Sequence, residues 1–254
     1  MNNIYAALIF FTRLPFWRLV TVPKESYKNV VAYWPAVGWL TGGISCLVLW
    51  LGSMALPFHV AVILMFLVRV IITGALHDDG LADFCDGFGG GVTRERILVI
   101  MKDSHIGTYG VIGLVFYYIT AIGLVASLPL HLAMATVFAG DAWSKFCAGR
   151  LIDFLPYARK EEEAKSKVVY NRLKPGTWIA SFLLGALPLL LLHHGWEPVA
   201  LFFPVAMISL LIWIMKRRIQ GYTGDCCGAA FLICELSFFL GMAIINHLEI
   251  CRLY

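Results

Sequence analysis

About seven apolar stretches, each close to the length of a membrane-spanning helix, dominate this sequence. A helix needs about 20 mostly apolar residues to cross a bilayer. Only 14% of the 254 residues are charged, against about 25% in soluble domains. The chain lacks the polar side chains to cover a water-soluble α/β globule, so we predict an all-α, polytopic integral membrane protein. The expected spans are residues 37–56, 58–76, 109–130, 132–149, 177–194, 197–215 and 228–247.

The N-terminal segment MNNIYAALIFFTRLPFWR precedes these spans. Its apolar part is too short to cross a bilayer, and no small-residue cleavage site follows it, as a signal peptide would require. We expect an interfacial or re-entrant helix anchored by Trp17 and Arg18. The chain has no internal repeat and no low-complexity tract, which predicts one membrane-embedded domain over residues 1–254.

The connections between the expected spans are of two kinds. Three are short and contain no lysine or arginine, whereas residues 77–108, 150–176 and 216–227 are longer and polar. Two spans separate each polar segment from the next, so all three emerge on one face with the N-terminus. All 20 basic residues except Arg252 lie at or near that face. The positive-inside rule makes it cytoplasmic, which predicts a multi-pass membrane protein whose N-terminus and polar loops face the cytoplasm.

Several other functions find no support in the sequence. The net charge of +4 reflects orientation in the membrane, and no basic patch interleaved with aromatic residues indicates nucleic-acid binding. The seven cysteines form no CxxC pair and no zinc spacing, so we expect reduced, structural thiols. The run KEEEAKSK at 160–167 is most simply a solvated loop or helix face.

The stretch HDDGLADFCDG at 77–87 gathers four aspartates directly after an apolar run. If the helix of the second span continues past residue 76, Asp79, Asp83 and Asp86 share one helix face, and Asp78 points about 100° away. Three stacked carboxylates repel one another and stay ionised only around a cation. Hard oxygen ligands favour Mg²⁺, or Mn²⁺, over zinc. The alternative is a helix end with solvated acids.

Residues 94–110, RERILVIMKDSHIGTYG, follow this stretch. Their apolar spacing predicts a short interfacial helix, after which the chain enters the third span. Glycines, hydroxyls and free N–H groups at a helix start can hold phosphate, and Asp103 is a fourth candidate metal ligand or a base. The candidate ligand-binding residues of this segment are Lys102, Asp103, Ser104, Gly107 and Thr108.

Two later segments offer similar chemistry. Thr223, Gly224 and Asp225 begin the last span, where the helix dipole favours an anion, although Asp225 alone is also explained as a helix cap. Arg159 in PYARKEE is a candidate phosphate ligand. Glu235 lies inside the last span, where an ionisable group is either functional or hydrogen-bonded to a neighbouring helix. Together these residues predict Mg²⁺-dependent displacement at a pyrophosphate without naming the substrate.

Three motifs at the cytoplasmic ends of the spans resemble the cobalamin synthase family, the adenosylcobinamide-GDP ribazoletransferases. They are HDDGLADFCDG (77–87), MKDSHIGTYG (101–110) and GYTGDCCGA (221–229). FFTRLP (10–15) and PYAR (156–159) fit as well, whereas EEEAKSK stands where a Gly-Leu-Gly element is expected. The resemblance implies an Mg²⁺-dependent membrane transferase that joins adenosylcobinamide-GDP to α-ribazole, or to its 5′-phosphate, and releases GMP. The product is adenosylcobalamin or its 5′-phosphate.

The resemblance also implies roles for particular residues and partners. Asp83, Asp86 and Asp103 become catalytic candidates, and the same three with Asp79 become metal ligands. Beyond the two substrates and the lipid bilayer, a second copy of the chain and other enzymes of the late cobalamin pathway are candidate partners. The substrate-binding candidates are His77, Lys102, Ser104, Gly107, Thr108, Arg159, Thr223, Gly224 and Asp225.

Three other activities remain as alternatives. A CDP-alcohol phosphotransferase also uses spaced aspartates, but its pattern has Ala-Arg after the first Asp-Gly, where this chain has Leu81-Ala82-Asp83. A membrane prenyltransferase would have NDxxD-like elements on two helices. A transporter would carry ionisable residues in mid-span, and apart from Glu235 the spans look almost bare of them.

Overall fold

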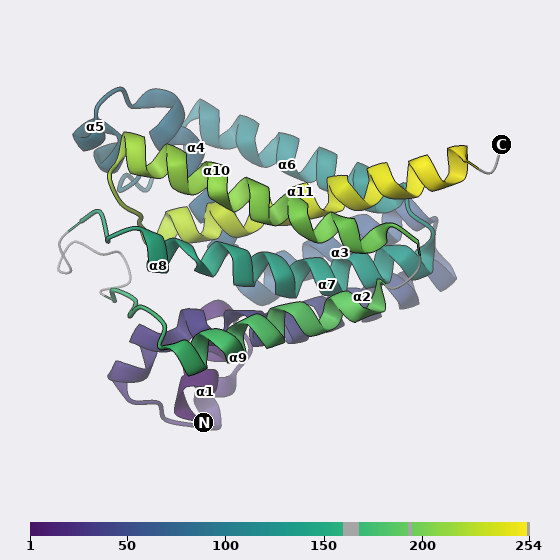
Figure 1. Ribbon diagram of the computed structural model, residues 1–254, viewed down its shortest axis with the longest axis horizontal. Coiled ribbons are helices and arrows are strands. Elements are labelled where there is room, and N and C mark those ends of the chain that lie inside the picture. The colour runs from purple at the N-terminus through teal and green to yellow at the C-terminus, as the bar shows by residue number, and fades with distance from the viewer. Residues whose placement is uncertain (160–167, 193–194, 253–254) are drawn as a thin grey trace.

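The computed structural model describes residues 1–159, 168–192 and 195–252, and these form an elongated helical bundle (Figure 1). Within these ranges the chain contains no β-strand, apart from an isolated bridge between Tyr157 and Tyr222. The prediction of an all-α fold is confirmed. The principal helices of the bundle are α2 (Trp34–Ala55), α3 (Phe58–Thr73), α6 (Thr108–Ala126), α7 (Leu130–Gly149), α9 (Pro175–Ala186), α10 (Phe202–Arg218) and α11 (Gly224–Cys251).

Each stretch predicted to span the membrane overlaps one of these helices. Four helical segments are long and apolar enough to cross a bilayer: Lys24–Ala55, Thr108–Ala126, Glu197–Arg218 and Gly224–Cys251. Helices α3 and α4 (Leu76–Gly90) together make a fifth if they are taken as one bent span. Neither α7 nor α9 is among these candidate spans, so the count of seven spans stays a prediction.

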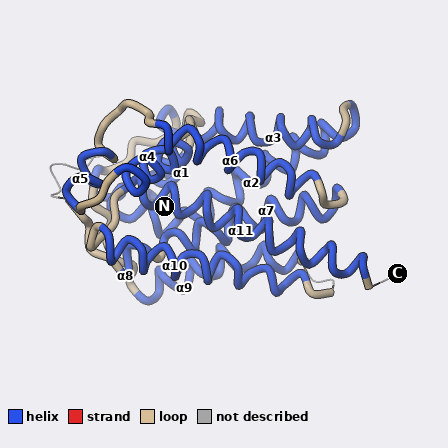
Figure 2. The backbone as a smooth tube through the Cα atoms, turned by 90° about the horizontal axis from the view of Figure 1, so that it is seen from above, coloured by secondary structure: helices blue, strands red, loops and turns tan. Residues whose placement is uncertain are grey.

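Short elements cluster at one end of the bundle, which we call the loop end. They are α1 (Asn2–Phe11), α4, α5 (Arg94–Ile100), α8 (Leu151–Phe154) and the 3₁₀ helices Phe16–Arg18 and Lys24–Tyr33. The C-terminus lies at the opposite end (Figures 1 and 2). The described parts of the three polar segments thus lie at the same end as the N-terminus, as the alternation of spans predicts. Two further 3₁₀ helices, Leu187–Leu191 and Glu197–Leu201, flank the connection from α9 to α10.

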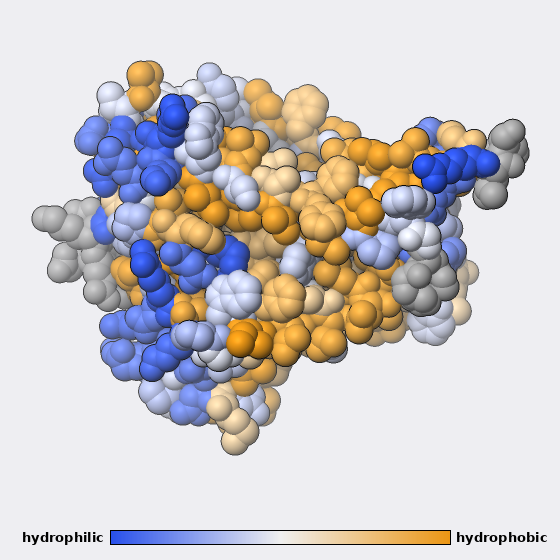
Figure 3. Space-filling view, viewed as in Figure 1, coloured by the Kyte–Doolittle hydropathy of each residue, from blue (hydrophilic) through white to orange (hydrophobic). Residues whose placement is uncertain are grey.

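The surface of the bundle has the polarity of a membrane protein. On the face shown in Figure 3, a broad apolar band covers the middle, and hydrophilic residues gather at the two ends. Large side chains such as Phe116, Leu190 and Phe202 are more than 60% exposed, far beyond the small apolar patches that soluble monomers show. Such side chains can face outward when lipid, and not water, surrounds this part of the protein.

The helix of the second span does not continue past residue 76. Helix α3 ends at Thr73, Gly74 and Ala75 take left-handed conformations (φ +64° and +56°), and α4 then leaves at 93°. The backbone N–H of Arg13 donates to the Ile72 carbonyl at 2.6 Å and ties the N-terminal segment to this break. The expectation of one continuous helix is therefore wrong, but residues 76–90 are helical, so the spacing of the aspartates within α4 is kept.

Two buried ion pairs stabilise the interior. Arg69 of α3 contacts both carboxylate oxygens of Glu235 in α11, at 2.5 and 2.7 Å, and Tyr117 of α6 hydrogen-bonds to both side chains. In α7, Lys145 pairs with Asp141 and also donates to Thr41 of α2. Glu235 is therefore hydrogen-bonded to neighbouring helices, which is one of the two roles expected for it from the sequence. The description of the spans as almost bare of charge is wrong, because the sequence-based view assigned Arg69 and Lys145 to helix ends and overlooked Asp141.

Candidate functional site

The site is built where α4 crosses the N-terminal end of α11, and two glycines set the distance between these helices. A Cβ atom added at Gly80 would lie 2.8 Å from the carbonyl oxygen of Asp225. One added at Gly228 would lie 3.2 Å from the Cα atom of His77. Each helix therefore places a residue without a side chain against the backbone of the other, which brings their acidic residues together.

Three carboxylates converge at this crossing. Asp79 and Asp83 of α4 and Asp225 of α11 each offer an oxygen, and these atoms lie within 4.8 Å of one another. Asp79 is exposed, Asp225 half-buried and Asp83 buried. We call these three residues the acid group. Oxygen donors from two helices at this spacing fit the donor set that Mg²⁺ or Mn²⁺ requires.

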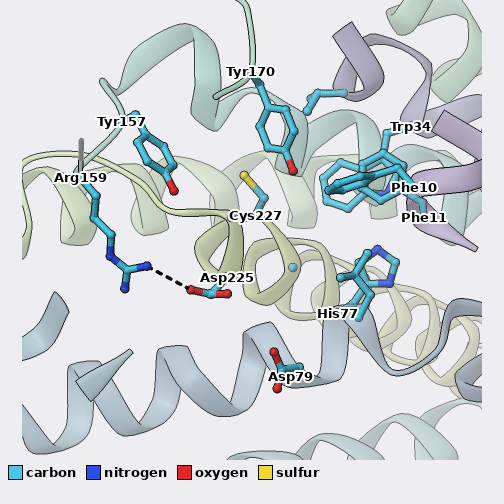
Figure 4. A pocket seen from close by; sticks show the side chains of 14 residues that line it. Phe10, Phe11, Trp34, His77, Asp79, Tyr157, Arg159, Tyr170, Asp225 and Cys227 are labelled. Carbon is cyan, nitrogen blue, oxygen red and sulfur yellow. Dashed lines mark ion pairs between the residues drawn. The ribbon is translucent and has the colours of Figure 1, made fainter. Parts of the chain in front are cut away.

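A cavity of about 300 Å³ opens beside the acid group (Figure 4). Asp79 and Asp225 lie on one side of it, and the aromatic rings of Phe10, Phe11 and Trp34 lie on another (Figure 4). Helix α1 and the first residue of α2 thus supply one wall, and α4 and α11 supply another. The remaining lining residues are Val31, Leu76, His77, Tyr157, Arg159, Tyr170, Gly224, Cys227 and Gly228.

Arg159 brings positive charge to this cavity. Its Nη1 atom lies 4.0 Å from a carboxylate oxygen of Asp225, and its Nη2 atom donates to the Leu98 carbonyl at 3.0 Å. The second contact fixes the guanidinium beside the acid group and leaves it N–H groups for an anionic ligand. The acid group and Arg159 together match the charges of a metal-bound phosphate.

Two tyrosines complete the wall near Arg159. Burial raises the pKa of Tyr157 to about 12, although the positive charge of Arg159 opposes the shift. Burial likewise raises the pKa of Tyr170 well above its ordinary value. Both phenols are therefore protonated and neutral at physiological pH, so they act as hydrogen-bonding groups and not as bases.

Asp86 has a different position from that of the acid group, although it lies on the same face of α4. Its carboxylate accepts hydrogen bonds from the backbone N–H groups of Gly107 and Gly110, at 2.7 and 2.9 Å. Those amides belong to the first turn of α6, where we expected a phosphate ligand. In this structure Asp86 takes the place of that anion and ties α4 to α6.

The loop before α6 contributes no residue to the acid group. The Asp103 carboxylate accepts hydrogen bonds from the backbone and side chain of His105, and these hydrogen bonds lower the pKa of Asp103. Lys102, Ser104 and Thr108 are exposed and do not line the cavity. The structure therefore does not bring these residues to the acid group.

The other predicted residues lie at the cavity or at the helix start beside it. His77 is buried, and its ring stacks on Trp34 and Phe11 with centroids 5.6 and 6.1 Å apart. Thr223 caps α11 by accepting a hydrogen bond from the Cys226 N–H at 3.3 Å. Gly224 lines the cavity. The expectation for the run KEEEAKSK lies outside the described residues.

The aromatic wall of the cavity was not predicted from the sequence. Its rings come from three separate segments of the chain and belong to Phe10, Phe11, Trp34, Tyr157 and Tyr170. Aromatic residues are also common at membrane interfaces, where they anchor the protein, so their presence alone does not indicate a binding site. One sequence signal did point to this wall. The stretches FFTRLP and PYAR match the family pattern, and both contribute residues to the cavity.

Comparison with known proteins gives one consistent result. The family model described as cobalamin-5-phosphate synthase matches residues 3–243. A Leptothrix cholodnii protein named adenosylcobinamide-GDP ribazoletransferase is 37% identical over 252 residues, covering 93% of each chain. Proteins of the same name from Shewanella frigidimarina (36% identity, 94% and 93% of the two chains) and Leptospira interrogans (33%, 96% and 95%) also match. No solved structure matches the chain.

Proposed function

The chain belongs to the cobalamin-5-phosphate synthase family, and on that premise we propose that it is an adenosylcobinamide-GDP ribazoletransferase. It joins adenosylcobinamide-GDP to α-ribazole, or to α-ribazole 5′-phosphate, and releases GMP. The observation that carries the proposal is the convergence of Asp79, Asp83 and Asp225 beside Arg159, at the edge of a cavity. Family membership favours this transfer over CDP-alcohol phosphotransfer, prenyl transfer and transport.

The acid group is the candidate site for Mg²⁺, or for Mn²⁺. Bound there, the ion would neutralise charge on the pyrophosphate and so make GMP a better leaving group. The residues that would hold it are Asp79, Asp83 and Asp225. This set differs from the one expected from the sequence, because Asp225 replaces Asp86 and Asp103.

The proposed reaction is a displacement at phosphorus. The 3′-hydroxyl oxygen of the ribazole forms a bond to the phosphorus on the cobinamide side of the pyrophosphate. The bond from that phosphorus to the bridging oxygen breaks, and the oxygen leaves with GMP. A carboxylate of the acid group accepts the hydroxyl proton. Arg159 is placed to hold the phosphate oxygens through its guanidinium.

We propose the cytoplasmic side of the bacterial inner membrane as the location of the loop end. Most basic residues of the chain gather at that end, in agreement with the positive-inside rule. Two water-soluble substrates would then reach the acid group from the cytoplasm. Association with a second copy, or with other enzymes of the late cobalamin pathway, remains a proposal.

The test is turnover by the purified protein in lipid nanodiscs. Adenosylcobinamide-GDP, α-ribazole and Mg²⁺ should give GMP and adenosylcobalamin in equal amounts. Asp83→Asn and Asp225→Asn should each reduce the rate by at least about a hundredfold, the size of effect seen for groups that stabilise developing charge. Absence of product from the wild type, or full activity in both variants, would refute the proposal.

A further inference from the structure

The cavity beside the acid group has two chemically different halves. Asp79, Asp225, Tyr157 and Arg159 form a polar half, which the proposed phosphate chemistry uses. The opposite half is aromatic, and the proposed displacement assigns it no role. We call it the aromatic compartment; it consists of Phe10, Phe11, Trp34, His77 and Tyr170 (Figure 4).

The rings of the aromatic compartment form an ordered wall. Phe11 and Trp34 stack nearly parallel, with centroids 4.9 Å apart and planes at 9°, and the His77 ring packs against both, with its centroid 5.6 Å from Trp34 and 6.1 Å from Phe11. Phe10 stands edge-on to Tyr170, with centroids 6.1 Å apart and planes at 90°. Aromatic rings attract one another in offset-stacked and edge-to-face arrangements, so a planar aromatic ligand can pack against this wall.

Two polar atoms within this wall lack partners. Among the described residues, neither Trp34 Nε1 nor His77 Nε2 has a hydrogen-bond partner, and both atoms are buried. Buried nitrogen atoms are normally hydrogen-bonded, because an unsatisfied one retains its full cost of desolvation. The Trp34 Nε1–H group can only donate, so a ligand that fits this wall would offer it an acceptor atom.

We infer that the aromatic compartment binds the planar base of the ribazole, an inference that rests on the proposed function. The base is a benzimidazole whose free ring nitrogen is its one remaining polar atom, so a largely apolar wall suits it. Guanine presents a carbonyl, a ring N–H and an amino group at one edge, and an apolar wall would leave them unpaired. The volume of about 300 Å³ is at the lower limit for ligand pockets, which excludes the corrin ring.

The position of the compartment agrees with the direction of the proposed reaction. His77 begins the stretch that carries Asp79, and Asp79 and Asp225 line the same cavity as Trp34. A base held against the wall would therefore extend its ribose toward the acid group. The nucleophilic hydroxyl belongs to that ribose, so the compartment orients the attacking molecule, whereas the leaving nucleotide lies elsewhere.

The experiment separates the two substrates with Phe10→Leu and Trp34→Phe. Phe10 is only half-buried, so its substitution is the milder of the two. Each variant should raise the KM for α-ribazole about tenfold, the scale of a lost base–aromatic contact, and leave the KM for adenosylcobinamide-GDP unchanged. Calorimetry with α-ribazole alone should show the same loss of affinity, and GDP alone should show none.

The matched control is Phe116→Leu, at a 65% exposed position of α6 in the apolar band. It should change neither KM. An increase in the KM for adenosylcobinamide-GDP, with ribazole binding unaffected, would overturn the inference and leave the proposed function intact. If the wild type makes no product, the proposed function fails, and calorimetry with α-ribazole still tests the compartment. Unfolding temperatures of all variants identify any that are misfolded.

Discussion

Gly80 of α4 lies so close to Asp225 of α11 that a methyl group at position 80 would come within 2.8 Å of the Asp225 carbonyl oxygen. The contact partner is backbone and cannot turn aside. We therefore predict that Gly80→Ala pushes the helices apart and separates Asp225 from Asp79 and Asp83. The acid group should lose at least about tenfold in Mn²⁺ affinity, because ligand positions must hold within about 0.5 Å. Electron paramagnetic resonance of Mn²⁺ measures this.

Gly90→Ala is the control for this prediction. It changes the last residue of the same helix, where an added Cβ atom would lie 3.6 Å from Ile100, an ordinary contact distance. Alanine should favour the helix by up to about 1 kcal/mol at either position. Equal Mn²⁺ binding by both variants would show that the close approach of α4 and α11 does not set the geometry of the acid group.

Asp86 and Asp83 should respond differently to the same substitution. Asp86→Asn removes a charge that accepts hydrogen bonds from two N–H groups of α6, and places an amide nitrogen against one of these donors. We expect a loss of about 2 kcal/mol in stability, typical of hydrogen bonds to charged groups, with Mn²⁺ binding retained. Asp83→Asn should abolish Mn²⁺ binding and leave the unfolding temperature unchanged or higher, because carboxylate repulsion is relieved.

Thermal unfolding and Mn²⁺ titration of the two variants, both in nanodiscs, measure these effects. Loss of Mn²⁺ binding in Asp86→Asn without loss of stability would indicate that Asp86 is a metal ligand. A loss of stability of similar size in both variants would show that Asp83 and Asp86 do not divide metal binding and helix contact between them.

The sequence predicted those parts of the site that depend on local geometry. Asp79 and Asp83 are four residues apart, so helical periodicity alone puts them on one face. Asp225 lies more than 140 positions further along the chain, and only the crossing of α4 and α11 brings it to them. Periodicity also aligned Asp86, but it could not show that the first turn of α6 would occupy that carboxylate.

The bend after α3 illustrates a second limit. Gly74 permits a left-handed backbone, yet Ala75 adopts one as well, which an L-amino acid with a side chain rarely does. Tertiary contacts enforce this conformation, including the hydrogen bond from Arg13 to Ile72. The local sequence of residues 58–76 contains no signal strong enough to predict a 93° turn between two helices.

The ion pair between Arg69 and Glu235 should contribute strongly to stability only as an intact pair. Glu235→Leu leaves the Arg69 guanidinium buried and uncompensated, at a cost of about 3–5 kcal/mol. The double variant Arg69→Met/Glu235→Leu should recover most of that loss, because no buried charge remains. Thermal unfolding of both single variants and of the double variant measures the interaction.

Glu25→Leu provides the exposed comparison. Glu25 pairs with Lys28 at 3.6 Å and is 83% exposed, so its removal should cost no more than about 1 kcal/mol. A double variant no more stable than Glu235→Leu would indicate that the shape of the two side chains matters more than their charge. Activity near the wild-type level in a stable double variant would confine the pair to a structural role.

Cys251 reports the orientation of the molecule. All seven cysteines lie in the described residues, and Cys251 is the exposed one, whereas the others are buried or half-buried. It lies at the C-terminal end of α11, opposite the loop end (Figure 1). If the loop end is cytoplasmic, a membrane-impermeant maleimide should label Cys251 in intact spheroplasts. The matched variant Lys102→Cys/Cys251→Ser carries an exposed thiol at the loop end, and it should react only after the membrane is broken. The reverse pattern would place the acid group outside the cytoplasm, away from the nucleotide-activated substrate that the proposed reaction consumes.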